Sequence, residues 1–201
     1  MPQLNYNKRS SKTVDGEKIS YGIVYGNENI VFIKTGADGN IRGYQDKYLK
    51  MVHRIHQRLG ATVICSSNNT EVDCADQVVA DEAMIAKVAA DCGLSRYEVS
   101  FVGTSDGGYH NLLLAKEIPQ TVKILGINPS LRIVEDFVEK IQALPCVQKI
   151  MVYGTKDDVY NECVPTLQAL ECESLEVVTV EGADHDFTGM VEAFIALIDL
   201  L

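Results

Sequence analysis

Val99-Ser-Phe-Val-Gly-Thr-Ser-Asp-Gly-Gly-Tyr109 starts as a short apolar run, passes through a serine flanked by glycines, and continues into a pattern typical of a helix. Within it, Gly103-Thr-Ser-Asp-Gly107 fits the pattern Gly-x-Ser-x-Gly. Between a strand and a helix, this pattern makes a tight turn with the serine hydroxyl at its tip. The two glycines let the strand and the helix approach each other across a strained turn. We therefore predict that Ser105 is a nucleophile.

Segments typical of strands and of helices alternate along the rest of the chain. Strands are predicted at 30–33, 61–65, 99–102, 122–128, 147–153 and 175–180, and helices at 43–59, 72–92, 106–117, 131–144, 161–171 and 187–200. Such alternation predicts an α/β fold, in which a mostly parallel sheet has helices on both faces. Residues 4–14 and 17–25 flank Asp15-Gly16, which predicts an antiparallel hairpin at the N-terminus. We expect a three-layer sandwich with about seven to eight strands.

The composition is that of one ordinary globular domain. The chain has 201 residues, 46% hydrophobic and 23% charged, and we expect a single domain over residues 1–201. The formal net charge of −10 argues against nucleic acid or an anionic membrane surface as a partner. We identify neither a signal peptide nor a membrane-spanning run. Six scattered cysteines without a Cys-x-x-Cys pair favour a reducing cytoplasm and give no zinc motif.

Candidate catalytic groups follow several of the predicted strands. Ser105 follows one strand, Asp157 and Asp158 follow a later one, and His185 follows the last. In a parallel sheet, functional loops leave the carboxyl ends of the strands. A serine hydroxyl needs a base to take its proton, and that base needs a carboxylate to orient it. The order Ser, Asp, His along this chain is the order found in α/β-hydrolases.

Over nearly its full length the chain resembles a small member of the α/β-hydrolase superfamily. Three segments carry most of the resemblance: Gly103-Thr-Ser-Asp-Gly107 resembles the nucleophile elbow, Gly154-Thr-Lys-Asp157 the acid segment, and Gly182-Ala-Asp-His185 the histidine segment. Thr35-Gly36-Ala37 resembles the family's His-Gly-x loop, with Thr in place of His.

The resemblance implies a catalytic triad with Ser105 as nucleophile, His185 as base and Asp157 as the orienting acid. It implies an oxyanion hole formed by the backbone N–H groups of Ala37 and Asp106, and neither a cofactor nor a metal. Many relatives carry a lid between the sixth and seventh strands, whereas only residues 128–146 lie there in this chain. We therefore expect an open site without a separate lid domain, suited to small or protruding acyl groups.

Two of these interpretations keep an alternative. Asp158 is the other candidate acid, because either aspartate can cap the helix that follows, although the spacing from Gly154 favours Asp157. The expected reaction is hydrolysis of a small carboxylic ester through an acyl-enzyme. A thioesterase, amidase or acyltransferase would use the same groups, and a non-catalytic binding protein with this fold is the alternative of a different class.

The sequence also gives expectations for His110, for Cys65 and for the charge around the site. We expect His110 to pack or hydrogen-bond inside the protein and Cys65 to be a core thiol rather than a nucleophile. Uncompensated carboxylates around the site would lower its potential, which predicts a preference for neutral or cationic acyl substrates. The aspartates expected on the surrounding loops are Asp38, Asp106, Asp158, Asp184 and Asp186.

Overall fold

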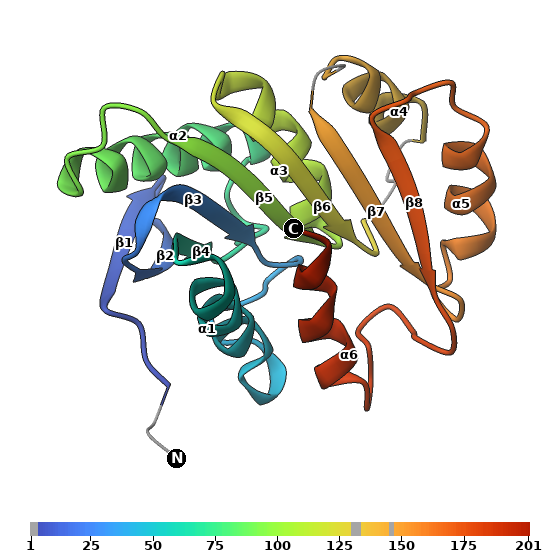
Figure 1. The fold of residues 1–201 in the computed structure, drawn as a ribbon, viewed down its shortest axis with the longest axis horizontal. Coiled ribbons are helices and arrows are strands. Elements are labelled where there is room, and N and C mark those ends of the chain that lie inside the picture. Colours follow the sequence, from blue (N-terminus) through green and yellow to red (C-terminus); the bar gives the residue numbers. More distant parts are fainter. Residues whose placement is uncertain (1–3, 130–133, 145–146) are drawn as a thin grey trace.

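An eight-stranded sheet forms the middle of the molecule (Figure 1) in the computed structural model, which describes residues 4–129, 134–144 and 147–201. The strands are β1 (Lys8–Val14), β2 (Glu17–Val24), β3 (Asn27–Lys34), β4 (Ala61–Ser66), β5 (Glu98–Thr104), β6 (Thr121–Ile127), β7 (Gln148–Gly154) and β8 (Leu175–Val180). Their order across the sheet is β1-β2-β4-β3-β5-β6-β7-β8. β1, β2 and β4 are joined by antiparallel pairing, and all neighbours from β4 to β8 are parallel. The predicted α/β sheet with an N-terminal hairpin is confirmed.

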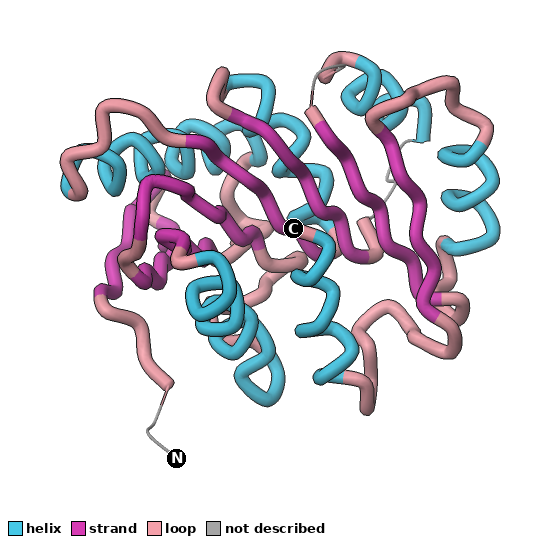
Figure 2. The backbone as a smooth tube through the Cα atoms, viewed as in Figure 1, coloured by secondary structure: helices cyan, strands magenta, loops and turns pink. Residues whose placement is uncertain are grey.

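Helices cover both faces of this sheet (Figure 2). They are α1 (Lys47–Leu59), α2 (Cys74–Asp91), α3 (Asp106–Glu117), α4 (Val134–Gln142), α5 (Tyr160–Gln168) and α6 (Val191–Ala196), with short 3₁₀ turns at Tyr44–Asp46 and Leu197–Leu200. α1 and α6 pack on one face, and α2 to α5 pack on the other. Among the described residues, no helix is both long and apolar enough to span a membrane.

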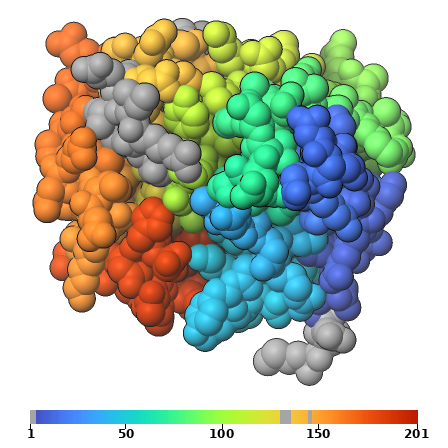
Figure 3. Space-filling model, turned by 180° about the vertical axis from the view of Figure 1, so that it is seen from behind, coloured from blue at the N-terminus to red at the C-terminus, as the bar shows by residue number. Residues whose placement is uncertain are grey.

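Alternation along the strands divides the apolar side chains between two cores. On β3, Phe32 points into the core under α2 and α3, whereas Val31 and Ile33 point into the core under α1 and α6. Successive side chains of a strand face opposite sides of the sheet, so a continuous apolar run predicts a strand covered on both faces. The space-filling view from behind shows the segment around α1 beside the C-terminal segment (Figure 3).

The last helix is shorter than predicted. The sequence pattern predicts a helix over 187–200, but α6 begins only at Val191. Phe187 has a φ of 56° and Gly189 a φ of 73°, which no regular right-handed helix contains. The Asp184 carboxylate accepts a hydrogen bond from the Thr188 N–H at 2.8 Å. The backbone directly after His185 therefore forms a turn, and the helix begins only after this turn.

The segment after β6 contains α4, at 134–142 of the predicted helix 131–144. Residues 130–133 and 145–146 lie outside the described residues, so the expected absence of a lid stays a prediction.

The parallel strands end at a common level, which brings their following loops together. Lys34 of β3 pairs with Gly103 of β5, and Gly154 of β7 pairs with Val180 of β8. The loops after these four strands therefore meet at one edge of the sheet, as expected for a parallel arrangement.

Candidate active site

Ser105 occupies a strained turn between β5 and α3. Its backbone has φ 53° and ψ −126°, a conformation that costs energy for any residue with a Cβ. The surrounding backbone holds it there, because the Ser105 N–H donates to the Ile127 carbonyl at 2.9 Å and the Gly108 N–H donates to the Ser105 carbonyl at 2.9 Å. The turn therefore directs the serine side chain away from the regular surfaces of both elements.

The two glycines around Ser105 are required by close packing. A Cβ on Gly103 would lie 2.4 Å from the Gly107 carbonyl oxygen, and a Cβ on Gly107 would lie 2.5 Å from the Lys34 carbonyl oxygen. Both distances are shorter than atoms can approach without a shift of the backbone. The requirement for small residues at these two positions, predicted from the sequence, is confirmed.

His185 lies between Ser105 and Asp157. Its Nε2 is 3.0 Å from Ser105 Oγ, and its Nδ1 is 2.9 Å from Asp157 Oδ2. A proton on Nδ1, directed at the carboxylate, leaves Nε2 as the acceptor for the serine hydroxyl. The three side chains thus form one hydrogen-bonded chain, built from the ends of β5, β7 and β8.

The two candidate acids have different surroundings. Asp157 is 5% exposed, and its Oδ1 also accepts the Val159 N–H at 3.2 Å, so its carboxylate is fixed in direction. Asp158 is exposed to solvent, and it is Asp157 that contacts His185. The side chain of His185 itself is 42% exposed, which keeps the pair open to small molecules.

Asn128 is a positioning residue that the sequence analysis missed. It is fully buried at the end of β6, and its Nδ2 donates to the carbonyls of Asp184 and His185 at 3.1 and 2.9 Å. Its Oδ1 accepts the Gly154 N–H at 2.8 Å. One amide therefore joins the acid loop to the histidine loop. Its position at the end of a predicted strand was the only signal, and this did not reveal the contact.

The loop after β3 lies against the serine turn. A Cβ on Gly36 would lie 3.4 Å from the Ser105 Cβ, and Ala37 lines the same cavity as Ser105. Asp106 is the first residue of α3, and the first N–H groups of a helix point out of its N-terminal end. Ala37 therefore lines the cavity at the serine and Asp106 directly follows Ser105, while their role as an oxyanion hole stays a prediction.

Thr35 stands where the family pattern has histidine, and it closes the loop by itself. Its hydroxyl donates to the Gly39 carbonyl at 2.8 Å and accepts the Asn68 N–H at 2.9 Å. The Gly36 N–H, in turn, donates to the Tyr48 hydroxyl at 3.3 Å. The loop is thus held by the chain's own side chains in a defined shape.

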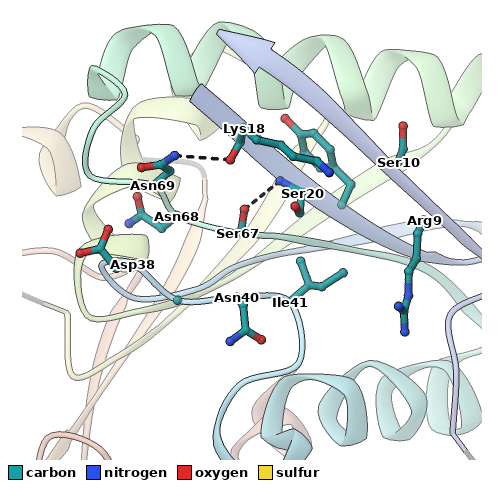
Figure 4. A pocket seen from close by; sticks show the side chains of 12 residues that line it. Arg9, Ser10, Lys18, Ser20, Asp38, Asn40, Ile41, Ser67, Asn68 and Asn69 are labelled. Atoms are coloured by element: carbon teal, nitrogen blue, oxygen red, sulfur yellow. Dashed lines mark hydrogen bonds between the residues drawn. The ribbon is translucent and has the colours of Figure 1, made fainter. Parts of the chain in front are cut away.

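A cavity of about 340 Å³ opens at the serine. Its lining includes Gly36, Ala37, Lys47, Tyr48, Ser105 and His185. A larger hollow of about 500 Å³ lies on the other side of the Asp38–Asn40 segment, among side chains of β1, β2 and the loop after β4 (Figure 4). There Ser67 Oγ accepts the Ser20 N–H at 2.8 Å, and none of the three triad candidates lines the hollow. The smaller cavity is therefore the candidate active site.

Comparison with known proteins supports the same architecture. No protein-family model and no curated protein matches the chain. Among solved structures, an α/β serine hydrolase homologue from Coxiella burnetii superposes with a TM-score of 0.74 at 16% identity, over 99% of both chains. A dienelactone hydrolase from Anabaena variabilis has a TM-score of 0.72 at 18% identity, over 98% of this chain and 97% of its own. Est1E from Butyrivibrio proteoclasticus has a TM-score of 0.71 at 13% identity, over 96% of both chains.

The chain has the α/β-hydrolase fold. At identities this low, the likeness establishes the fold alone, so the chemistry has to be argued from the side chains of this protein.

In this α/β-hydrolase fold, a buried ionic cluster lies at the end of β3, next to the loop that packs against the serine turn. Lys34 and Asp81 are both fully buried, with Nζ 2.8 Å from Oδ2. The Lys34 ammonium also donates to Gln77 Oε1 at 2.9 Å and to the Ser67 carbonyl at 3.0 Å. Because Lys34 ends β3 and directly precedes Thr35, this cluster fixes where the loop beside Ser105 begins.

His110 completes the cluster from the α3 side. Its Nε2 lies 2.9 Å from Asp81 Oδ2, a close polar contact that is not aligned as a hydrogen bond. Burial lowers the pKa of His110, and the nearby Lys34 charge lowers it further, although Asp81 acts in the opposite direction. Burial opposes ionisation of Asp81, but the Lys34 charge and His110 outweigh it and lower the pKa of Asp81 to about 2. His110 thus packs and makes polar contacts inside the protein, as predicted.

The described residues contain no group of three or more His, Cys, Asp or Glu side chains arranged to hold a metal ion. Cys65 is fully buried, and burial raises the pKa of its thiol to about 12, which matches the expected core thiol.

Proposed function

We propose that this chain is a serine hydrolase that cleaves small carboxylic esters through an acyl-enzyme on Ser105. The observation that carries the proposal is the continuous hydrogen-bonded chain from Ser105 Oγ through His185 to Asp157, with distances of 3.0 and 2.9 Å. These distances lie within the range in which a base can take a hydroxyl proton.

In the first half of the proposed reaction, Ser105 attacks the ester carbonyl. His185 Nε2 takes the hydroxyl proton as the Oγ–carbon bond forms, and Asp157 stabilises the imidazolium through Nδ1–H. The N–H groups of Ala37 and Asp106 donate to the developing oxyanion. Collapse of the tetrahedral intermediate breaks the carbon–oxygen bond to the alcohol, which leaves with the proton from His185.

In the second half, water replaces the alcohol and the same groups act again. His185 takes a proton from water, whose oxygen attacks the acyl carbon. Collapse of the second intermediate releases the carboxylic acid and returns the proton to Ser105 Oγ. The exposure of the His185 side chain, 42%, supports this step, because water can approach the imidazole from solvent.

The size of the cavity and the names of similar structures support a small ester as the substrate. A volume of about 340 Å³ lies at the lower end of the range typical of small-molecule pockets. The similar structures include a protein named dienelactone hydrolase and another named ferulic acid esterase. Small-molecule esters therefore remain our proposal, in place of nucleic acid or a membrane surface.

The cytoplasm stays the proposed location. The five cysteines within the described residues, Cys65, Cys74, Cys92, Cys163 and Cys172, are free thiols, which agrees with a reducing compartment.

The proposal is tested by labelling with an uncharged fluorophosphonate, which forms a stable adduct with an activated serine. We expect one adduct on the folded wild-type protein and none on Ser105→Ala. Ser10→Ala, a serine on β1 away from the triad, is the matched control and keeps the adduct. A folded wild-type protein without an adduct would indicate a binding protein, and an adduct that persists in Ser105→Ala would mean that another residue is the nucleophile.

A further inference from the structure

The cavity beside Ser105 is lined by a buried lysine that the proposed triad does not use. Lys47, the first residue of α1, lines this cavity and is only 7% exposed. Within the described part of the chain, its ammonium makes no ion pair and no hydrogen bond. Lysine is rarely buried without a partner, because removing an ammonium from water is costly.

Aromatic rings account for part of this environment. Lys47 Nζ lies 4.8 Å from the centre of the Phe194 ring and 5.5 Å from the centre of the Tyr48 ring. Ring faces attract a cation, but they do not accept the three hydrogen bonds that an ammonium can donate. Burial accordingly lowers the pKa of Lys47, although Asp186 and Asp184 act in the opposite direction. The donors of Lys47 therefore remain available to an occupant of the cavity.

The surrounding aspartates compensate Lys47 only weakly. Asp184 is directed at the Thr188 N–H at 2.8 Å, and Asp38 accepts hydrogen bonds from the Thr70 N–H and hydroxyl at 3.1 and 2.6 Å. Asp186 lines the cavity, but its side chain is exposed. Water and salt screen exposed charges, whereas a buried charge acts at closer to full strength on whatever enters the cavity beside it.

We propose that Lys47 binds a carboxylate on the substrate, so that the preferred ester carries a free carboxylate besides the bond that Ser105 attacks. A carboxylate supplies the acceptor oxygens and the negative charge that the buried ammonium lacks, and such charge-assisted hydrogen bonds are the strong ones. Cleavage of the ester by Ser105 rests on the proposed function, whereas binding of a carboxylate by Lys47 does not. This preference for a carboxylate is opposite to the preference for neutral or cationic acyl groups expected from the sequence, and the same measurement decides between them.

The kinetic test compares matched esters. The 4-nitrophenyl monoesters of succinate, glutarate and adipate are compared with their methyl-capped, uncharged counterparts on the wild type and on Lys47→Met. We expect the wild type to favour at least one charged ester, and Lys47→Met to lower the ratio of kcat/KM values, charged over uncharged, by roughly tenfold or more. The loss appears mainly in KM, because the carboxylate is bound equally in the ground state and the transition state.

Two further variants separate charge from packing. Lys50→Met makes the same change at a half-buried position of α1 outside the cavity lining, and we expect it to keep the wild-type ratio. Lys47→Arg keeps the positive charge and should retain part of the preference. A wild type that favours every uncharged ester, or a Lys47→Met protein that keeps the wild-type ratio, overturns the inference.

A binding measurement distinguishes this inference from the proposed function. Calorimetric titration of Ser105→Ala with glutarate is compared with the same titration of Ser105→Ala/Lys47→Met. We expect the dissociation constant of the double variant to be at least tenfold larger. If glutarate binding depends on Lys47 but the folded wild type takes no fluorophosphonate, the anion site stands and the hydrolase is refuted. Ester turnover without any dependence on Lys47 would keep the hydrolase and refute the anion site. Thermal unfolding of each variant reports whether it is folded.

Discussion

Two Asp–His pairs in this molecule have the same separation and different surroundings. Asp157 Oδ2 lies 2.9 Å from His185 Nδ1, and Asp81 Oδ2 lies 2.9 Å from His110 Nε2. The His185 side chain is 42% exposed, with Ser105 Oγ on its other nitrogen, whereas that of His110 is 2% exposed, with Cys74 Sγ 3.7 Å from its other nitrogen.

The two carboxylates also differ in the charges around them. Asp81 is already paired with the buried Lys34 ammonium, so a second positive charge on His110 is opposed by the first. Within the described residues, Asp157 makes no ion pair with a lysine or an arginine, and its ionic contact is with His185. A short Asp–His contact therefore does not define a catalytic pair. What matters is whether the histidine can become charged and whether a substrate can reach it.

The largest expected effect on activity separates the two histidines. We expect His185→Gln to lower kcat/KM for a 4-nitrophenyl ester by about 10⁴-fold or more, because the members of a triad act as a unit. His110→Gln should change it by less than about tenfold while lowering the stability, because it alters only buried packing and polar contacts. Steady-state kinetics with thermal unfolding of both variants make the comparison. Equal losses of activity would contradict the distinction between the two pairs.

The next effect separates the neighbouring acids. Asp157→Asn is expected to lower kcat by roughly 10³- to 10⁴-fold, because an amide favours the wrong tautomer of His185. Asp158→Asn is the matched control at an exposed position and should retain most of the activity. If Asp158→Asn were the damaging change in the kinetic assay, the assignment of the acid would have to be reversed.

The buried pair is expected to affect stability instead. Asp81→Asn leaves the Lys34 ammonium buried without a counter-charge, which should lower the free energy of unfolding by about 3–5 kcal/mol. Asp157→Asn should lower it by much less, since no buried cation loses its partner. Urea unfolding followed by circular dichroism measures both. A loss below about 1 kcal/mol for Asp81→Asn would show that the cluster contributes little net stability.

The smallest effect is a pH dependence with a defined direction. The pKa of Asp81 is lowered to about 2 in the folded chain, against about 3.9 for an unfolded aspartate. Its stabilisation is complete above about pH 4 and is lost as the pH falls toward 2, because the unfolded chain then binds more protons. Unfolding free energies measured between pH 5 and 2 should fall more steeply for the wild type than for Asp81→Asn. Parallel curves would assign the acid sensitivity to other carboxylates.

Much of the site follows from local sequence. The apolar runs, the glycines around Ser105 and the spacing from Gly154 to Asp157 are short-range patterns that report directly on strands, turns and strand ends. The topology of a parallel sheet then brings strand ends to one edge. For this reason the sequence alone predicted which loops meet, and His185 lies within hydrogen-bonding distance of both Ser105 and Asp157.

Only the tertiary structure determined the contacts between side chains far apart along the chain. Lys34 and Asp81 are 47 residues apart, and Asn128 and His185 are 57 residues apart. The pattern of residues 187–190 predicted a helix, yet these residues form a turn in which the Thr188 N–H donates to the Asp184 carboxylate. Whether Lys47 and His110 face water or lie buried depends on packing across the sheet, and local periodicity carries no information about a partner on another element. The sequence therefore determined the order of the elements and the candidate nucleophile, base and acid, while three-dimensional packing decided which charges are buried and which remain accessible.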